Sequence, residues 1–406
     1  MIASGYLVLP DLSGDNTITI QKGWIEWDGP IVVRVEIGDD HPNPDLGGPE
    51  SLISPGFIDT HLHLPQVDAM GAYGMQLLDW LEQVVFPAEA NWADPDHAAK
   101  RTDTLLDQLI SVGTTGFFAF SANFREATLA ALERSKERGF RAKIGQPLTD
   151  MHIHDALIKS VQENMDDART TIEKFPESST SRVAAAIAPR FALTCSSELL
   201  EACGVLVTDT GAYLETHLAE MEPECVLACE RHQASDYTAI YEQAGLLGPR
   251  SFFGHGIYLS DSEQARLAAS GSVIAHCPTS NTFLRSGTMN RRHYETIGLA
   301  TSLASDIAGG PDKSMIRVAR AMMEASFHVD AEPAPSLEAW WQITQGNAER
   351  LGWNSAGIIH EGADADLVVI QPHPDWLTAR DPLGYVIFGW DDRWLEQTIL
   401  RGKPVL

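Results

Sequence analysis

Between residue 55 and about residue 310, short apolar runs alternate with longer segments in which apolar residues recur every three or four positions. The short runs suit buried strands and the longer segments suit amphipathic helices. One such helix is DPDHAAKRTDTLLDQLISVG, which opens on Asp-Pro and stops at Gly. The expected strands lie in SPGFIDTHLH, TTGFFAFSA, RAKIGQPL, VAAAIAPRF, AYLETHLAE, SFFGHGI, SVIAHCPTSN and LATSLASD. About eight strands with helices between them predict an α/β fold, a (β/α)8 TIM-like barrel.

The two ends of the chain share a different pattern. Short strand-like runs with Gly, Asp and Pro between them occur in GYLVLP, TITIQKGWIEWDG and IVVRVEIGD, and again in DADLVVIQ, YVIFGW and EQTILRGKPVL. We therefore expect residues 1–54 and 357–406 to pair into a small β-sandwich domain. Residues 55–356 would then form the catalytic barrel.

Composition narrows the class of protein. With 406 residues, 44% hydrophobic and 21% charged, the chain matches an ordinary soluble globular protein. No apolar run reaches the length of a membrane span, and the N-terminus lacks the basic start of a signal peptide. The five cysteines are scattered and odd in number, which suits a reducing compartment. We expect a cytoplasmic protein without a membrane partner.

The net charge of -27 bears on binding partners. An acidic surface repels phosphate backbones, so nucleic acid is not an expected partner. Solubility is the plainer explanation of the charge.

The stretch PGFIDTHLHLPQ places His61 and His63 at the end of the first expected strand of the barrel. Residues i and i+2 of a strand point to the same side, so the two imidazoles can aim at one point. Histidine is the commonest metal ligand, and this arrangement suits a divalent metal. Two polar residues in a loop after a strand are the alternative, and further ligands are needed to decide between them.

Further side chains of this kind follow other expected strands. His217, Glu220, His255 and Asp306 lie at the ends of the fifth, sixth and eighth strands. Each alone has a structural explanation, such as a buried histidine or a helix cap. Barrel enzymes carry their chemistry at the carboxyl ends of the strands, so together these residues indicate a metal site with an acid beside it.

The quoted motifs also carry a resemblance. The stretches PGFIDTHLHLPQ, LLDWLEQVVFPAE, APRFALTCS, THLAE, GHGIYLS, AHCPTSN and SDIAGG are similar to those of the amidohydrolase superfamily, and within it to the guanine deaminases. This resemblance covers nearly the whole chain. It implies zinc-dependent conversion of guanine to xanthine and ammonia in purine catabolism, and a homodimer.

The resemblance also implies roles for individual residues. One zinc ion would be held by His61, His63, His217, His255 and Asp306. Zinc-bound hydroxide would attack C2 of the purine, with Glu220 as proton shuttle and Asp306 as base. Substrate contacts would come from Gln66, Arg190, Phe191 and His217. The ligand types also suit iron or manganese.

The sequence departs from the family pattern at two positions. Met221 follows Glu220 where the family usually has Asn, and Ser305 precedes Asp306 where Thr is usual. The fourth strand ends in IAPRF rather than in a Lys that could bridge two metals, which favours a single metal.

Alternatives stay open at this stage. One is a zinc deaminase acting on 8-oxoguanine, a pterin or a triazine, and another is a non-catalytic scaffold on the same fold. His276 is either close to the metal ligands or structural, and Trp80 and Phe86 either wall the purine pocket or pack a helix. His152 and His154, a second H-x-H motif, are expected in a loop.

Overall fold

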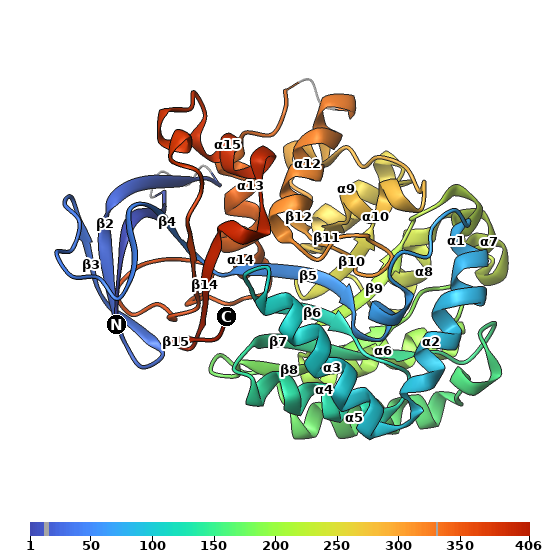
Figure 1. Ribbon diagram of the computed structural model, residues 1–406. Coiled ribbons are helices and arrows are strands. Elements are labelled where there is room, and N and C mark those ends of the chain that lie inside the picture. Colours follow the sequence, from blue (N-terminus) through green and yellow to red (C-terminus); the bar gives the residue numbers. More distant parts are fainter. Residues whose placement is uncertain (12–15, 330–331) are drawn as a thin grey trace.

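The computed structural model describes residues 1–11, 16–329 and 332–406. Figure 1 shows two parts, a barrel surrounded by helices and a separate sheet in which the two ends of the chain lie side by side. The barrel strands are β5 (Phe57–His63), β6 (Thr114–Phe120), β7 (Arg141–Leu148), β8 (Val183–Pro189), β9 (Leu214–Leu218), β10 (Ser251–His255), β11 (Val273–His276) and β12 (Ala300–Leu303). Neighbours in sequence are parallel neighbours in the sheet, which confirms the predicted barrel.

Helices follow most of the barrel strands and cover the outside of the barrel (Figure 1). They are α3 (Pro95–Ile110), α4 (Arg125–Glu137), α5 (Val161–Lys174), α6 (Ser197–Thr210), α7 (Glu222–His232), α8 (Tyr237–Gln243), α9 (Asp261–Ser270), α10 (Pro278–Phe283) and α11 (Arg291–Thr296). Helix α3 begins and ends close to where its Asp-Pro and Gly signals predict. Its first turn is capped by the Asp94 carboxylate, which accepts from the Asp96 N–H at 3.0 Å.

Three short helical pieces lie over the carboxyl ends of the barrel strands. They are α1 (Leu77–Trp80), a π-helical turn (Leu81–Val85) and α2 (Phe86–Ala90), and they run as one continuous segment. After the barrel come α12 (Met315–Val329), α13 (Ser336–Trp341), α14 (Asn347–Arg350) and α15 (Pro382–Gly389).

The terminal sheet contains β1 (Ile2–Pro10), β2 (Ile18–Asp28), β3 (Ile31–Ile37), β4 (Leu46–Pro55), β13 (Leu367–Ile370), β14 (Leu395–Leu400) and β15 (Lys403–Pro404). The strand order is β15-β14-β13-β4-β1-β2-β3, so β4 and β13 join the two ends of the chain. Within the described residues these strands make one mixed sheet rather than two facing sheets. The division into domains at residues 54 and 357 stays a prediction.

The prediction of a strand in YVIFGW was wrong, because all of these residues except the last, Trp390, belong to helix α15. The Asp381 carboxylate accepts from the Gly384 N–H at 2.9 Å, and Pro382 is the first helical residue. Val386 and Ile387 are buried in one hydrophobic cluster with α12 and α13. A strong N-terminal cap therefore outweighs the strand preference of the aromatic and β-branched residues.

Buried ion pairs attach the terminal sheet to the barrel. Asp364 accepts from Arg141 Nε at 2.6 Å and from Arg182 Nη1 at 2.9 Å. Asp366, just before β13, accepts from Arg182 Nη2 at 2.6 Å. Arg141 is the first residue of β7, and Arg182 directly precedes β8. These ion pairs therefore lie at the amino ends of the barrel strands, opposite the carboxyl ends.

Side chains, together with a few backbone hydrogen bonds, close the seam between β5 and β12, where the described backbone has no strand ladder. The Asn347 amide donates to the Ile58 and Leu303 carbonyl oxygens, both at 2.7 Å. Its oxygen accepts from the Leu303 N–H at 2.9 Å. Thr60 adds a hydroxyl bond to Ser302 at 2.8 Å. One asparagine from α14 therefore satisfies backbone groups on both sides of this seam.

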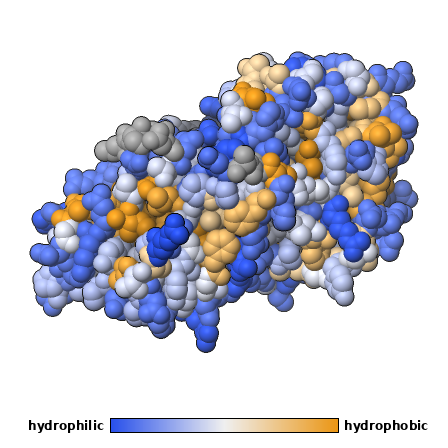
Figure 2. Space-filling model, turned by 90° about the horizontal axis from the view of Figure 1, so that it is seen from above, coloured by the Kyte–Doolittle hydropathy of each residue, from blue (hydrophilic) through white to orange (hydrophobic). Residues whose placement is uncertain are grey.

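The face of the molecule shown in Figure 2 is mainly hydrophilic, in agreement with the ordinary globular composition of the chain. Hydrophobic residues form scattered groups on this face. Across the described ranges, no helix is both long and apolar enough to cross a membrane.

Replacing Asn347 by Ala is expected to lower the free energy of unfolding by about 3 kcal/mol, because each buried polar group left unsatisfied costs about 1–3 kcal/mol. Chemical denaturation would measure the change. Asn354→Ala, at an exposed asparagine, is the matched control and should leave stability nearly unchanged. Equal stability of the two variants would show that Asn347 does not hold the seam.

Candidate active site

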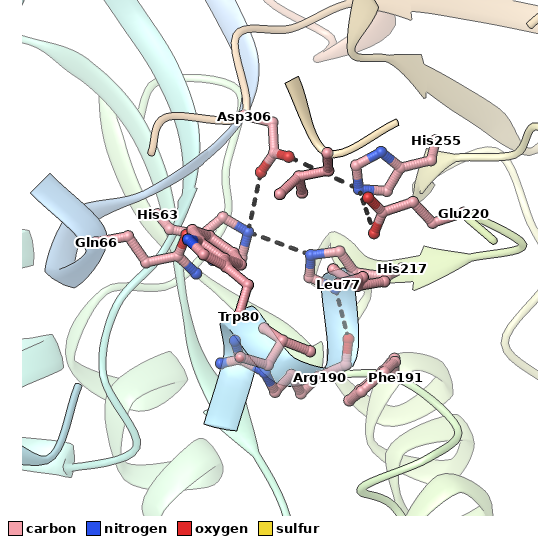
Figure 3. Close-up of a pocket in the computed structure, with 12 residues that line it drawn as sticks. His63, Gln66, Leu77, Trp80, Arg190, Phe191, His217, Glu220, His255 and Asp306 are labelled. Atoms are coloured by element: carbon pink, nitrogen blue, oxygen red, sulfur yellow. Dashed lines mark hydrogen bonds and ion pairs between the residues drawn. The ribbon is translucent and has the colours of Figure 1, made fainter. Parts of the chain in front are cut away.

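Histidines from three strands converge with Asp306 at the carboxyl ends of the barrel strands (Figure 3). His63 Nε2 lies 3.2 Å from His217 Nε2 and 3.3 Å from Asp306 Oδ1. His61 Nε2 lies 3.5 Å from Asp306 Oδ1. His255 Nε2 lies 3.8 Å from the other carboxylate oxygen of Asp306. The structure thus brings together all five residues that the resemblance implies as metal ligands.

The outer nitrogens of three of these imidazoles face fixed partners. His217 Nδ1 lies 2.7 Å from the Arg190 carbonyl oxygen, which can only accept a hydrogen bond, so Nδ1 carries the proton. The lone pair of Nε2 is then available to bind a metal. His255 Nδ1 lies 3.0 Å from Asn281 Oδ1, and His61 Nδ1 lies 2.8 Å from Glu215 Oε1. Such outer partners orient metal-binding histidines and increase their basicity.

The protonation states also suit metal binding. Burial lowers the pKa of His63 to about 4 and holds the pKa of His217 well below its usual value. Burial alone would raise the pKa of Asp306, but the hydrogen bond from His63 and the nearby imidazoles lower it below its usual range. The neutral imidazoles of His63 and His217 and the ionised carboxylate of Asp306 are the forms that coordinate cations.

A divalent metal ion fits these residues. The ligand atoms of His61, His63 and His217 all lie within 4.8 Å of one another. His61 Nε2 is buried and has no hydrogen-bond partner among the described residues, although such atoms normally have one. Cys277 forms a second compact group with His61 and His255, so its thiol also lies close to the site.

The backbone has an unusual conformation at two of these residues, His255 and Asp306. His255 has a φ of 71° and Asp306 a φ of 50°, both in the left-handed region that non-glycine residues rarely adopt. Gly254 is required beside them, since a Cβ there would lie 2.9 Å from His61 Cε1. Backbone strain of this kind collects at functional sites.

Glu220 faces the same cluster from the loop after β9. Its Oε2 lies 3.5 Å from His255 Nε2, and its Oε1 accepts from the Ser286 hydroxyl at 2.8 Å. Burial raises the pKa of the Glu220 carboxyl. A buried carboxyl beside a metal cluster can hold or release a proton during a reaction.

Glu224 holds the loop that carries Glu220. Its carboxylate accepts from the Glu220 N–H at 2.9 Å, the Met221 N–H at 3.2 Å and the Tyr237 hydroxyl at 2.7 Å. Met221 packs its side chain against the main hydrophobic cluster. Glu224 therefore holds the backbone at Met221, the position where this sequence differs from the family pattern.

A cavity opens above the cluster, with about 370 Å³ of space when its solvent-filled mouth is included. Its lining residues are His63, Gln66, Leu77, Trp80, Leu81, Arg190, Phe191, His217, Glu220, His255, Leu284 and Asp306. All four residues expected to contact substrate are among them. Mixed apolar walls with a few converging polar groups are typical of small-molecule sites.

The residues left open by the sequence have distinct places. Trp80 lines the cavity, whereas the Phe86 ring lies under Arg190, with its centroid 5.2 Å from Cζ. His152 and His154 lie in the loop between β7 and α5, as expected, and line a neighbouring cavity. His276 ends β11, and burial lowers its pKa to about 3.

Four polar residues of the site were not singled out from the sequence. Glu215 precedes His217 by two positions on β9, and this i, i+2 spacing was a usable signal. Glu89 ends the quoted stretch LLDWLEQVVFPAE. Asn281 and Ser286 come from the chain around and after α10, far in sequence from the residues they contact, and no local pattern identifies them.

Comparisons with known proteins agree with this geometry. A family model described as the amidohydrolase family matches residues 52–405. The chain is similar to guanine deaminase from Escherichia coli (29% identity, covering 96% of this chain and 91% of that protein). It is also similar to a probable guanine deaminase from Deinococcus radiodurans (34% identity, covering 81% of this chain and 75% of that protein).

A solved structure gives the same result for the fold. Guanine deaminase from C. acetobutylicum, with guanine bound in the active site, has a TM-score of 0.91 to this structure at 27% identity, covering 100% of this chain and 99% of that chain. Since the family model spans most of the chain and the relatives match along most of its length, this chain belongs to the amidohydrolase family.

Proposed function

We propose that this protein is a guanine deaminase, which hydrolyses guanine to xanthine and ammonia. The observation that carries the proposal is the convergence of four histidines and Asp306 beside buried Glu220, next to a cavity lined also by Arg190 and Gln66. The names of its relatives in bacteria and eukaryotes support the same activity. A scaffold without catalysis would have no need to keep every ligand and the acid together.

We propose zinc as the metal, held by His61, His63, His217, His255 and Asp306. Zinc lowers the pKa of a coordinated water to about 7 and so supplies a nucleophile at neutral pH. A structure similar in fold to this one, that of an atrazine chlorohydrolase from Arthrobacter aurescens, is complexed with zinc.

The two carboxylates would divide the proton transfers. Asp306 lies within the histidine cluster and is placed to accept a proton from the attacking water. Glu220 faces the cavity and is placed to protonate N3 of the purine, which makes C2 more electrophilic. The proton accepted by Asp306 would then pass to the departing amine, and Glu220 would regain a proton from the hydroxyl formed at C2. Carboxylates in different surroundings commonly take separate acid and base roles.

The cavity wall opposite the cluster would recognise the base. The Arg190 guanidinium can donate to a carbonyl oxygen, and the Gln66 amide can pair with a purine edge. Phe191 and Trp80 supply flat apolar surface next to them. A cytoplasmic location and a homodimer stay predictions.

Glu220→Gln should keep the fold and the metal but lose about 10²–10⁴-fold in kcat, because an amide cannot shuttle a proton. Steady-state release of ammonia from guanine would measure the loss. The control is Glu222→Gln, at an exposed carboxylate two residues away. Near-normal kcat in the Glu220 variant would remove this residue from the mechanism.

His217→Ala should lose bound metal together with activity, because one ligand and its tie to the Arg190 carbonyl both disappear. Elemental analysis of the purified variant would measure the metal content. His328→Ala, at an exposed histidine of α12, should retain it. A full complement of metal in the His217 variant would show that the ligand set is different.

The protein should deaminate guanine, with little activity on adenine and less on guanosine than on the free base. A site that hydrogen-bonds a substrate group rejects analogues that lack it, since its buried donors are left unpaired. Arg190→Ala should strongly lower kcat/KM for guanine while the metal stays bound. Ammonia release across a panel of purines and pterins would test both points.

Two results would contradict this assignment. A preference for a pterin or triazine over guanine would keep the deaminase chemistry and change the substrate. An unchanged kcat/KM in the Arg190 variant would place the purine elsewhere in the cavity.

A further inference from the structure

Arg190 is clamped by two residues of helix α2. Its Nη1 donates to both carboxylate oxygens of Glu89, each at 2.7 Å, and the Phe86 ring lies beneath its guanidinium. Arg190 is 2% exposed and Glu89 is 1% exposed. Phe86 and Glu89 are three residues apart, so one helical face supplies both contacts. The arginine is therefore held in one position before any ligand arrives.

Glu89 also faces Gln66, the other polar residue proposed to recognise the base. Gln66 Nε2 lies 3.5 Å from Glu89 Oε1. A carboxylate only accepts hydrogen bonds, so it turns the amide nitrogen of Gln66 toward itself. The amide oxygen, Oε1, is buried and has no hydrogen-bond partner among the described residues.

That unpartnered oxygen points to a ligand. Gln66 is 2% exposed and lines the cavity, and buried acceptors without a partner are rare in folded proteins. In the described structure the Arg190 hydrogen bonds to Glu89 all pass through Nη1, which leaves the other guanidinium donors for the cavity. The wall thus offers donors from one residue and an acceptor from the next.

We infer that Glu89 is a positioning residue that sets which heterocycle this site accepts. It fixes Arg190 as the donor and Gln66 as the acceptor. Arg190 and Gln66 together then select a base that presents a ring carbonyl beside N–H donors. Guanine has such an edge, formed by its 6-carbonyl, N1–H and 2-amino groups. The inference rests on the proposed function and adds the residue that orients its two recognition groups.

Only a carboxylate performs both tasks. A neutral amide at position 89 would offer a donor as well as an acceptor, so the Gln66 amide could turn over and present its nitrogen to the cavity. The buried Arg190 charge would also lose its counter-charge, which is costly in a protein interior. Both changes would weaken recognition of the carbonyl edge specifically.

The test is binding of two purines that lack an amino group and cannot be deaminated. Hypoxanthine carries the 6-carbonyl and N1–H, whereas purine carries neither. Titration calorimetry on metal-loaded protein should give tighter binding of hypoxanthine than of purine. In Glu89→Gln the Kd of hypoxanthine should rise about tenfold or more, the typical effect of a lost charged hydrogen bond, while the Kd of purine should change little.

Two further variants separate positioning from general structure. Glu89→Asp keeps the carboxylate and should retain part of the preference for hypoxanthine. Glu82→Gln, at an exposed carboxylate on the same helical segment, should retain all of it. A Kd that rises equally for both purines, or an unchanged Kd of hypoxanthine in Glu89→Gln, would overturn the inference.

A double variant guards against misfolding caused by an unpaired charge. Glu89→Gln combined with Arg190→Ala removes both charges. Adding Glu89→Gln to Arg190→Ala should weaken hypoxanthine binding less than Glu89→Gln weakens it in the unsubstituted protein, because only the effect through Gln66 remains. Additive losses would contradict the inference. If guanine is not turned over by the unsubstituted protein, the proposed function fails, and the two purine affinities still decide the role of Glu89.

Discussion

Closure of the barrel between β5 and β12 is the constraint on which the site depends. His61 and His63 lie on one side of this seam and Asp306 on the other, so the register of the seam decides whether they meet. The Asp306 N–H donates to the His61 carbonyl at 2.9 Å, and the His63 N–H donates to the Ile307 carbonyl at 2.8 Å. Asp59 adds hydrogen bonds from the Ser305 N–H and hydroxyl. The contacts that close the barrel are therefore also those that set the spacing of the cluster.

Burial governs the remaining chemistry of the site. Charged and polar groups taken out of water are tolerated when each has a close partner. Arg190 has Glu89, His61 has Glu215, and Glu220 has Ser286, and each pair joins residues from different elements. The site is consequently oriented by distant parts of the chain before a ligand binds.

The sequence predicted the barrel and placed the residues proposed as metal ligands at the carboxyl ends of its strands, because strand length, alternation and strand ends are local signals. Glu215 left a local signal too, in its spacing from His217. Asn347 and Glu89 could not be identified this way, because their importance lies in contacts with residues far along the chain, such as Ile58 and Arg190. The error at YVIFGW shows the opposite case, in which a single capping residue, Asp381, overrode a misleading strand-like composition.

The sheet formed by the two ends also governs the order of assembly during synthesis. Strand β4 pairs with β13 on one side, and more than 300 residues separate the two in the chain. A ribosome releases β1 to β4 first, so one edge of β4 stays unpaired until the whole barrel has emerged. Open strand edges invite pairing with other chains. Truncations near the C-terminus would therefore harm this protein first through aggregation of its N-terminal strands, even though the histidine and Asp306 cluster is encoded before residue 307.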